Sequence, residues 1–455
     1  MFWDKAISAT IAAHFAALTL ESLPAATVHA TRRALLDGLG VMRGASGSDG
    51  DALPYRNHAL TATGPSRLIG LAHRTTPSLA ALANGALAHA LDFGDTFDAG
   101  PAHPNAALIP ALLALADARP EVDFATFLTA MAAGSDLACR LSLAPARSYE
   151  EGGWYPPPLV NLIAGAAACA RLIGLNADGI RHAMGLALVQ GSFPAEIKYD
   201  PASPMRGVRE GFVARACVES ALLAEQGATA FAEPLEGRAG FFAIYGGGPP
   251  GDALLDGLGT RFLGDQVSFK PWPACRGTHP YIEAALHLRD TIDVDAVERI
   301  KAETGPIQEM LIRPQPVKAA PSRPIEAKFS IPYTVAAALI DGDVTLASFT
   351  PNRIDDAATR LLAARVVEVR NPDWGRAQAA SGSLTFHLRG GEVRTHRVMQ
   401  AAGHPHRPID DDALIAKYVD CARFADPDTP PDQARQQAFE IISLLPEYPA
   451  NALAI

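Results

Sequence analysis

Residues 78–91 read SLAALANGALAHAL, and they indicate a helix that is apolar along one side. The apolar residues recur at intervals of three and four, as on one helical face: Leu79, Leu82, Ala86, Leu87, Ala90 and Leu91. Segments with the same pattern occur on both sides of it, at 28–39, 104–115, 162–173, 180–189 and 213–226. The first half of the chain therefore predicts a large domain of packed helices.

The pattern changes after about residue 260. Strands are expected at 266–269, 296–303, 365–370, 383–388 and 392–398, the last two forming a hairpin across Gly390-Gly391. Helices are expected at 281–288 and 333–339, a loop at the proline-rich stretch 313–324, and helix again from about Asp410. We predict a fold that is mainly α plus α+β, with a large all-helical domain and a smaller inserted α+β domain. The first would span residues 1–260, completed by a C-terminal helix in 405–455, and the second residues 261–404.

Composition excludes several classes of protein. The 455 residues are 48% hydrophobic, which supports a sizeable core, and the formal net charge of −10 argues against nucleic acid as a partner. No run of about 18 apolar residues lacks charges, so no membrane span is expected. The cysteines are scattered without CxxC spacing, which predicts free thiols in a cytoplasmic protein: Cys139, Cys169, Cys217, Cys275 and Cys421.

The densest polar cluster of the first half is LDFGDTFDAGPAHPN, residues 91–105. It joins two predicted helices, and its polar side chains share one short loop: Asp92, Asp95, Thr96, Asp98 and His103. His103-Pro104 stands where the second helix begins, and helix N-termini attract carboxylates. The aspartates also suit simple capping. With His89 the cluster offers metal-ligand types, but no standard ligand spacing is present, and no metal or other cofactor is expected.

A second cluster is KPWPACRGTHP, residues 270–280. Lys270 and Arg276 are cationic, and His279-Pro280 repeats the His-Pro helix start of the first cluster. Cys275 is interpreted either as a nucleophile beside cations or as an inert thiol. The Gly- and Pro-rich stretch 246–251 lacks the N–H donors of a phosphate-binding loop and is expected to be a plain loop.

At these clusters the chain resembles the MmgE/PrpD family. The resemblance lies in HALDFGDT (89–96) with AHPNAALIPALLALAD (102–117), FKPWPACRGTHPYIEAAL (269–286) and EAKFSIPYTVAAALIDG (326–342). It implies a helical domain with an α+β lid domain, a homodimer, no metal or organic cofactor, and a small di- or tricarboxylate as substrate. The reactions of the family share a protonation or carbanion-like step beside a carboxylate.

The resemblance also implies a set of site residues. The catalytic residues would be Asp92, His103, Lys270 and Tyr333. The substrate-binding residues would be Thr96, Tyr155, Arg206, Cys275, Arg276, His279 and Lys328. In this interpretation Lys270 is the base, and His103 or Tyr333 is the opposing acid. The decarboxylase branch of the family carries His, Lys and His where this chain has Tyr155, Arg206 and Cys275, which argues against decarboxylation.

The expected function is that of a hydro-lyase of the 2-methylcitrate dehydratase type, acting by proton abstraction α to a carboxylate. Three alternatives remain open at this point. One is an epimerase of the iminodisuccinate epimerase type, which needs two acid/base groups on opposite faces of one carbon. The others are a cis-aconitate-type decarboxylase and a non-catalytic carboxylate-binding protein.

Overall fold

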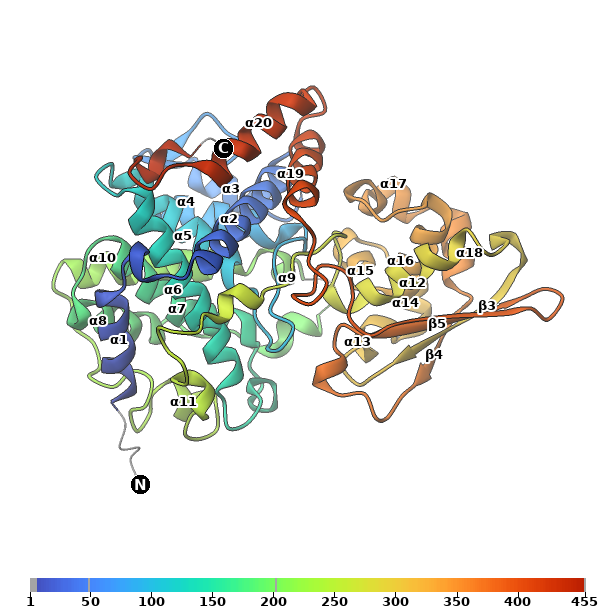
Figure 1. Ribbon diagram of the computed structural model, residues 1–455, viewed down its shortest axis with the longest axis horizontal. Coiled ribbons are helices and arrows are strands. Elements are labelled where there is room, and N and C mark those ends of the chain that lie inside the picture. The colour runs from blue at the N-terminus through green and yellow to red at the C-terminus, as the bar shows by residue number, and fades with distance from the viewer. Residues whose placement is uncertain (1–5, 48–49, 201–202, 454–455) are drawn as a thin grey trace. The chain divides into compact units, whose positions relative to one another are not determined.

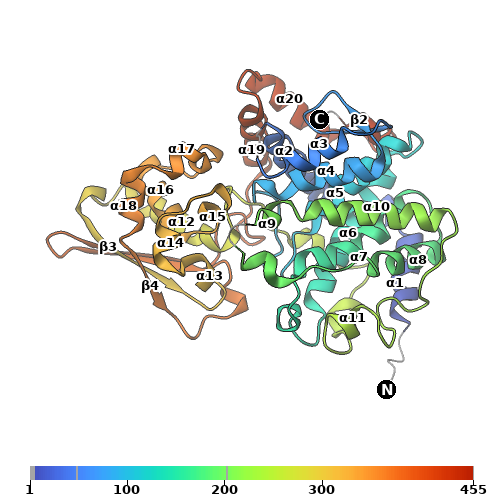
Figure 2. The same cartoon turned by 180° about the vertical axis from the view of Figure 1, so that it is seen from behind.

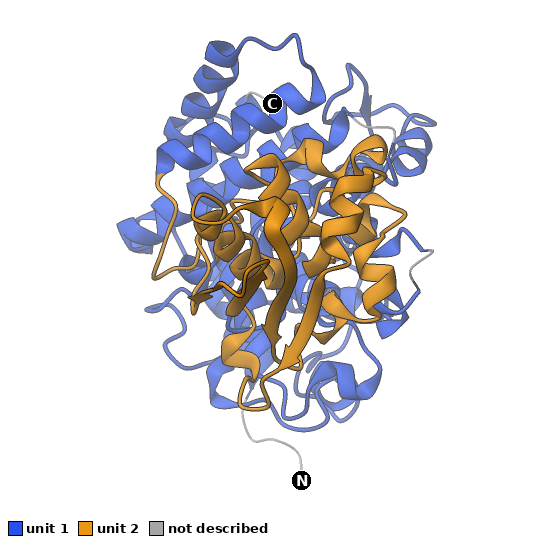
Figure 3. Ribbon diagram, turned by 90° about the vertical axis from the view of Figure 1, so that its right-hand side faces the viewer, with its two compact units in different colours: residues 1–90, 94–267, 411–455 blue, residues 91–93, 268–410 orange. Residues whose placement is uncertain are grey.

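The computed structural model describes residues 6–47, 50–200 and 203–453, and the chain divides into two compact units (Figure 3). Unit 1 comprises Met1–Ala90, Gly94–Val267 and Asp411–Ile455; unit 2 comprises Leu91–Phe93 and Ser268–Asp410. Unit 1 is built from helices and unit 2 from helices and a four-stranded sheet, so the predicted fold class, mainly α plus α+β, is confirmed. No helix in the described part of the chain is long and apolar enough to cross a membrane.

The stretch SLAALANGALAHAL forms most of α4 (Pro77–Ala90), which packs closely along α10 (Glu210–Glu225) (Figure 2). Two glycines permit this approach. A Cβ atom on Gly85 would lie 2.8 Å from the carbonyl oxygen of Glu210, and one on Gly211 would lie 2.4 Å from that of Leu82. Such distances are far inside contact range, so a side chain at either position would force the two helices apart.

Unit 1 contains further helices (Figures 1 and 2). They are α1 (Ile7–Ala17), α2 (Ala25–Ser46), α3 (Leu53–Ala59), α5 (Pro104–Ala118), α6 (Phe124–Leu143), α7 (Pro156–Leu172), α8 (Ala177–Leu188), α9 (Met205–Val208), α11 (Phe241–Ile244), α19 (Asp411–Ala425) and α20 (Pro431–Ser443). A short pair of strands, β1 (Ser66–Arg67) and β2 (Arg74–Thr75), completes the unit. The C-terminal α19 lies along α2, where Lys417 forms a buried ion pair of 2.6 Å with Asp37.

Unit 2 contains a mixed sheet with strand order β4-β3-β5-β6. The central β3 (Val297–Thr304) runs parallel to β4 (Val366–Arg370) and antiparallel to β5 (Gly382–Leu388). β5 pairs in turn with β6 (Val393–Val398), which confirms the predicted hairpin. Helices α12 (His279–Arg289) and α16 (Ile331–Asp341) pack together, and α12 also covers β5 and β6 (Figure 1). The shorter helices of the unit are α13 (Glu309–Ile312), α14 (Gln315–Ala319), α15 (Pro324–Lys328), α17 (Pro351–Ile354) and α18 (Ala357–Ala363).

Two local predictions were wrong. Residues 266–269 form no strand; a 3₁₀ turn occupies Leu263–Gln266 instead. The backbone N–H of Leu263 donates to the Asp136 carboxylate at 2.7 Å, which anchors that turn on α6. The stretch 313–324 is not all loop, because α14 lies within it and α15 begins at its end. Pro316 and Pro324 stand in the first turns of these helices, where the missing N–H group is no loss.

All five cysteines lie in the described part of the chain, and none of them forms a disulfide, as predicted. Cys139, Cys169 and Cys217 are fully buried in unit 1, where burial raises the pKa of each thiol. A buried thiol of this kind is a poor nucleophile, so these three residues act as small apolar side chains in the helix packing.

Candidate active site

His103 closes the loop between α4 and α5 in unit 1, and α5 begins at the next residue, Pro104. Its ring atom Nδ1 lies 2.9 Å from the carbonyl oxygen of Asp95. A carbonyl can only accept, so Nδ1 carries the hydrogen and the lone pair of the neutral ring sits on Nε2. The imidazole is half-buried, and its centroid is 4.7 Å from that of the buried His89 ring on α4. The Asp95 carbonyl and the His89 ring therefore fix the orientation of the His103 imidazole.

The loop that carries His103 is held by its own polar side chains. Asp95 is buried, and its carboxylate accepts a hydrogen bond of 2.6 Å from the Asn105 amide. Burial raises the pKa of Asp95 to about 7, and the neighbouring Asp37 adds to this, while the Asn105 bond lowers it. Thr96 donates at 3.5 Å to the carbonyl of Ala102, which also accepts from the backbone N–H of Phe97 at 3.0 Å. The Thr96 hydroxyl therefore makes its hydrogen bond within the loop that carries it.

A buried polar network lies behind His103, and the sequence did not predict it. The Asn161 amide donates to the carbonyl of His103 at 2.9 Å and to the Glu210 carboxylate at 3.3 Å. Glu210 pairs with the Arg209 guanidinium at 3.1 Å, and both side chains are fully buried. Burial raises the pKa of Glu210, whereas Arg209 and Asn161 lower it. The one available sequence signal was the adjacent Arg209-Glu210 pair directly before the mostly apolar run 211–214.

The same network reaches two of the residues expected to bind substrate. The Arg209 guanidinium carbon lies 4.9 Å from the centre of the Tyr155 ring, a cation–π distance. Tyr155 is buried at the start of α7, and its backbone N–H donates to Phe193 at 2.8 Å. The Arg209 guanidinium also donates to the carbonyl of Arg206, the half-buried arginine of α9. Arg209 thus connects Tyr155 and Arg206 with Glu210 and so with the network that contacts His103.

In unit 2, Lys270 and Asp92 form a buried ion pair. The Lys270 ammonium lies 3.1 Å from the Asp92 carboxylate and donates to the Asp92 carbonyl at 2.8 Å. Both side chains are at most 2% exposed. The backbone angle φ of Asp92 is 48°, in the left-handed region that residues other than glycine rarely adopt. Strain of this kind persists only where the surroundings fix it, and it clusters at functional sites.

Arg276 and His279, from the same stretch as Lys270, contact backbone carbonyls. The Arg276 guanidinium donates to Ala402 at 2.7 Å and to Ala401 at 3.1 Å. The His279 ring is fully buried, with Nε2 at 3.1 Å from the carbonyl of Ala274. These bonds tie the stretch 270–280 to its surroundings within unit 2, as a scaffold would.

Three further residues expected at the site also donate hydrogen bonds to backbone carbonyls of unit 2: Lys328, Tyr333 and Cys275. The Lys328 ammonium donates to the carbonyl of Pro273 at 2.8 Å and lies 4.1 Å from the centre of the Phe349 ring. The Tyr333 hydroxyl donates to the carbonyl of Ser348, and burial raises the pKa of Tyr333 to about 12. Cys275 is half-buried, and its backbone N–H donates to Lys328. Tyr333 is therefore a weak candidate for a catalytic acid.

His103 and the residues that support it belong to unit 1, and the Lys270–Asp92 pair belongs to unit 2. A metal is a poorer fit. Imidazoles of His89 and His103 are suitable ligands, but structural and catalytic zinc sites need three or four protein ligands. Asp92 belongs to the same cluster of metal-ligand types in the sequence. In unit 2 its carboxylate pairs with the Lys270 ammonium, which would compete with a metal cation for it.

Family models match most of the chain. The MmgE/PrpD N-terminal domain matches residues 9–253, and the MmgE/PrpD C-terminal domain matches residues 272–443. The chain therefore belongs to the MmgE/PrpD family, which confirms the resemblance seen in its sequence motifs.

Curated relatives are enzymes with carboxylate substrates in their names. Cis-aconitate decarboxylase of Homo sapiens is 28% identical over 358 residues, covering 76% of this chain and 72% of that protein. The cis-aconitate decarboxylase-like protein oryM of Aspergillus oryzae is 26% identical, covering 87% of this chain and 86% of that protein. The 2-methylcitrate dehydratase of Cupriavidus necator is 25% identical, covering 84% of each chain. These relatives support a carboxylate-transforming enzyme without selecting one reaction.

Proposed function

We propose that this member of the MmgE/PrpD family is a hydro-lyase of the 2-methylcitrate dehydratase type, acting on a small di- or tricarboxylate. The observation that carries the proposal is the buried Lys270–Asp92 pair on a strained backbone. A buried ammonium is suited to a substrate carboxylate, on which negative charge grows when the adjacent carbon loses a proton. The polar groups around His103 supply the matching acid/base function.

In the proposed mechanism His103 removes the proton. Its Nδ1–H is directed at the carbonyl of Asp95, so Nε2 accepts the proton from the carbon α to a carboxylate. The electrons of that C–H bond form the C=C bond, and those of the C–O bond leave with the hydroxyl group, which takes up a proton and departs as water. Lys270 is proposed to stabilise the charge on the carboxylate and to donate that proton. This reverses the roles expected from the sequence, because the ion pair with Asp92 supports an ammonium rather than an amine base.

Substrate binding is proposed to involve Arg206, Tyr155 and Thr96 of unit 1. Arg206 is half-buried on α9, and its guanidinium can form a bidentate pair with a carboxylate. Tyr155 and Thr96 complete the proposed binding set. Arg276, His279, Lys328 and Tyr333 are proposed to hold the lid-side stretch in shape, since their polar atoms contact backbone carbonyls. Cys275 marks a position that adjusts substrate choice.

Cis-aconitate decarboxylation is the second candidate, because decarboxylases stand among the relatives. Loss of CO₂ leaves its electron pair on the substrate carbon, and an acid must then protonate that carbon. The sequence resemblance implies that the chain differs from the decarboxylase branch at Tyr155, Arg206 and Cys275, and this expected difference is the reason for preferring dehydration. An epimerase would need a second acid/base group facing His103; Lys270 is the group proposed for that role in this alternative.

Proton NMR in D₂O separates the candidates. The protein would be incubated with citrate, 2-methylcitrate, cis-aconitate and iminodisuccinate in separate samples. Dehydration predicts a new vinyl proton signal from citrate, and from 2-methylcitrate it predicts that the methyl doublet becomes the singlet of a methyl group on a C=C bond. Decarboxylation predicts loss of cis-aconitate with release of CO₂. Epimerisation predicts exchange of the α-proton without an alkene. Release of CO₂ from cis-aconitate without dehydration of citrate or 2-methylcitrate would replace the hydro-lyase proposal by the decarboxylase, and binding without any turnover would replace both.

The expected homodimer is also kept as a proposal. Light scattering on the purified protein measures it, since two chains of 47.9 kDa would give about 96 kDa. A monomer at the concentration used for turnover would contradict it without affecting the assignment of the chemistry.

A further inference from the structure

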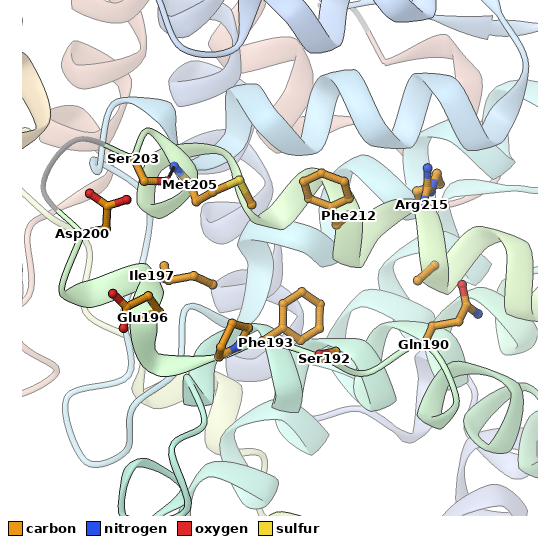
Figure 4. Close-up of a pocket in the computed structure, with 12 residues that line it drawn as sticks. Gln190, Ser192, Phe193, Glu196, Ile197, Asp200, Ser203, Met205, Phe212 and Arg215 are labelled. Carbon is orange, nitrogen blue, oxygen red and sulfur yellow. Dashed lines mark hydrogen bonds between the residues drawn. The ribbon is translucent and has the colours of Figure 1, made fainter.

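Unit 1 contains a second place where a small molecule fits, at residues that the proposed reaction does not use. A pocket of about 430 Å³ opens between the 3₁₀ turn Ala195–Lys198 and the helices α9 and α10 (Figure 4). Phe193 and Ile197 form one wall, and Met205 and Phe212 form the opposite one. The volume falls within the range of pockets that enclose small organic ligands.

The second wall is held in place by its packing. The hydroxyl of Tyr55 on α3 contacts the Met205 sulfur at 3.7 Å, and the Tyr55 ring meets the Phe212 ring edge to face at 5.7 Å. On the facing wall, Phe193 and Ile197 are each only 8% exposed. Both apolar walls therefore exist before any ligand arrives, and a ligand would not have to order them.

Charges of opposite sign stand at the two ends of the pocket. Figure 4 shows Glu196 and Asp200 at one end and Arg215 with Gln190 at the other. The buried Nε of Arg215 makes no hydrogen bond to any residue that the structure describes, and its ion pair with Glu219 is long, at 3.9 Å. The Arg215 guanidinium is thus available to a carboxylate at that end, and the opposite end attracts a cation.

We propose that this pocket binds an elongated zwitterion, with a primary ammonium at one end, several methylene groups in the middle and a carboxylate at the other. The ammonium pairs with Glu196 and Asp200, the methylene chain lies between the Phe193 and Phe212 walls, and the carboxylate pairs with Arg215. ω-Amino carboxylates have this chemistry. A di- or tricarboxylate does not, because one of its anionic ends would face two aspartate or glutamate side chains. The inference stands independently of the proposed reaction.

Ligand-observed NMR titration of the full chain tests the chemical class. The probes are 4-aminobutanoate, 6-aminohexanoate and 8-aminooctanoate, with hexanoate and hexylamine as single-charge comparisons. We expect one of the zwitterions to bind about three- to fivefold more tightly than either comparison, because each exposed charge pair adds up to roughly 1 kcal/mol, a factor of about five. Equal binding of hexanoate and 6-aminohexanoate, or no binding of any zwitterion, would overturn the proposal.

Variants locate the binding site. Arg215→Gln and Glu196→Gln should each lower the affinity for the tightest-binding zwitterion about three- to fivefold. Ser192→Trp should block binding, because it places a large side chain in the pocket lining. Arg238→Gln and Glu233→Gln make the same charge changes at exposed residues outside the pocket lining and should leave affinity unchanged. If the control variants weakened binding as much as the pocket variants, the zwitterion would be responding to net charge and not to this pocket.

Discussion

The chain has two His-Pro helix starts, and they have different surroundings. His103-Pro104 opens α5 in unit 1, and His279-Pro280 opens α12 in unit 2. His103 is half-buried, its Nδ1 is fixed by the carbonyl of Asp95, and its ring lies beside His89. His279 is fully buried, with Nε2 at the carbonyl of Ala274 and its ring 5.3 Å from that of Trp272.

The difference teaches that the same dipeptide can serve chemistry or structure, according to what surrounds it. Proline suits the first turn of a helix in both cases, so the sequence signal is the same. A half-exposed imidazole with one nitrogen fixed can exchange protons with a substrate, whereas a fully buried one cannot reach it. The two buried lysines of unit 2 repeat the contrast: Lys270 faces a carboxylate, and Lys328 faces a carbonyl and an aromatic ring.

The largest expected effect comes from the lysine pair. Lys270→Met should lower kcat roughly 10²–10⁴-fold, as loss of an acid/base or charge-stabilising group does. Lys328→Met, a matched change at a second buried lysine, should leave kcat within about tenfold of the original. Turnover is measured per folded protein, with the folded fraction taken from circular dichroism. Equal losses in the two variants would remove the distinction between them.

The support behind His103 gives the next effect. Glu210→Gln leaves the buried Arg209 without its anionic partner, and breaking such a pair costs about 3–5 kcal/mol of unfolding free energy. Glu219→Gln, at a half-exposed pair on the same helix, should cost under about 1 kcal/mol. Urea unfolding followed by circular dichroism measures both. If the two variants had equal midpoints, the network behind His103 would not be a strong support.

A pH dependence follows from Asp95. Its pKa is raised to about 7 in the folded protein, so between about pH 4 and pH 7 the folded chain holds a proton that the unfolded chain releases. Stability from this group is therefore greatest at low pH and falls as the pH rises through 7. Three pKa units correspond to about 4 kcal/mol.

Asp95→Asn should remove that fall, because the amide cannot ionise and its oxygen can still accept the Asn105 hydrogen bond. The measurement is the urea midpoint of both proteins from pH 4.5 to pH 8.5. As the pH rises, the urea midpoint of the variant should rise increasingly above that of the original protein. Parallel curves would show that Asp95 does not cause the pH dependence, which would then be sought in other charges such as the Asp37–Lys417 pair.

The smallest of the predicted effects is the loss of stability caused by a substitution at His279. His279→Asn should cost about 1–3 kcal/mol of unfolding free energy, since it disturbs a buried hydrogen bond and a ring contact. Thermal unfolding monitored by circular dichroism measures the loss. A variant as stable as the original would mean that His279 is not held by its surroundings, and the structural side of the comparison would fail.

The sequence predicted most of the elements, and the reason lies in their local signals. Helix α4 shows an unbroken apolar face, and the hairpin of β5 and β6 shows alternation around Gly390-Gly391. The strand expected at 266–269 was wrong because a distant residue, Asp136, anchors the turn before it. Local pattern carries no information about such a partner.

The candidate site was predicted in part for the same reason. The family motifs pointed to His103 and Lys270, whose neighbours in sequence carry the resemblance. They did not reveal the Asn161–Glu210–Arg209 network, because its members come from α7, α10 and the residue between α9 and α10. Nor did they separate Lys270 from Lys328, since the burial and bonding of a lysine depend on tertiary contacts.

The central claim is that His103 performs chemistry and His279 does not. The most direct measurement is the rate of α-proton exchange or water loss in D₂O for His103→Asn and His279→Asn, on the substrate that the NMR screen identifies. The account predicts a loss of roughly 10²–10⁴-fold for His103→Asn and a rate within about tenfold of the original for folded His279→Asn. Full turnover by His103→Asn, or an equal loss in both variants, would contradict it.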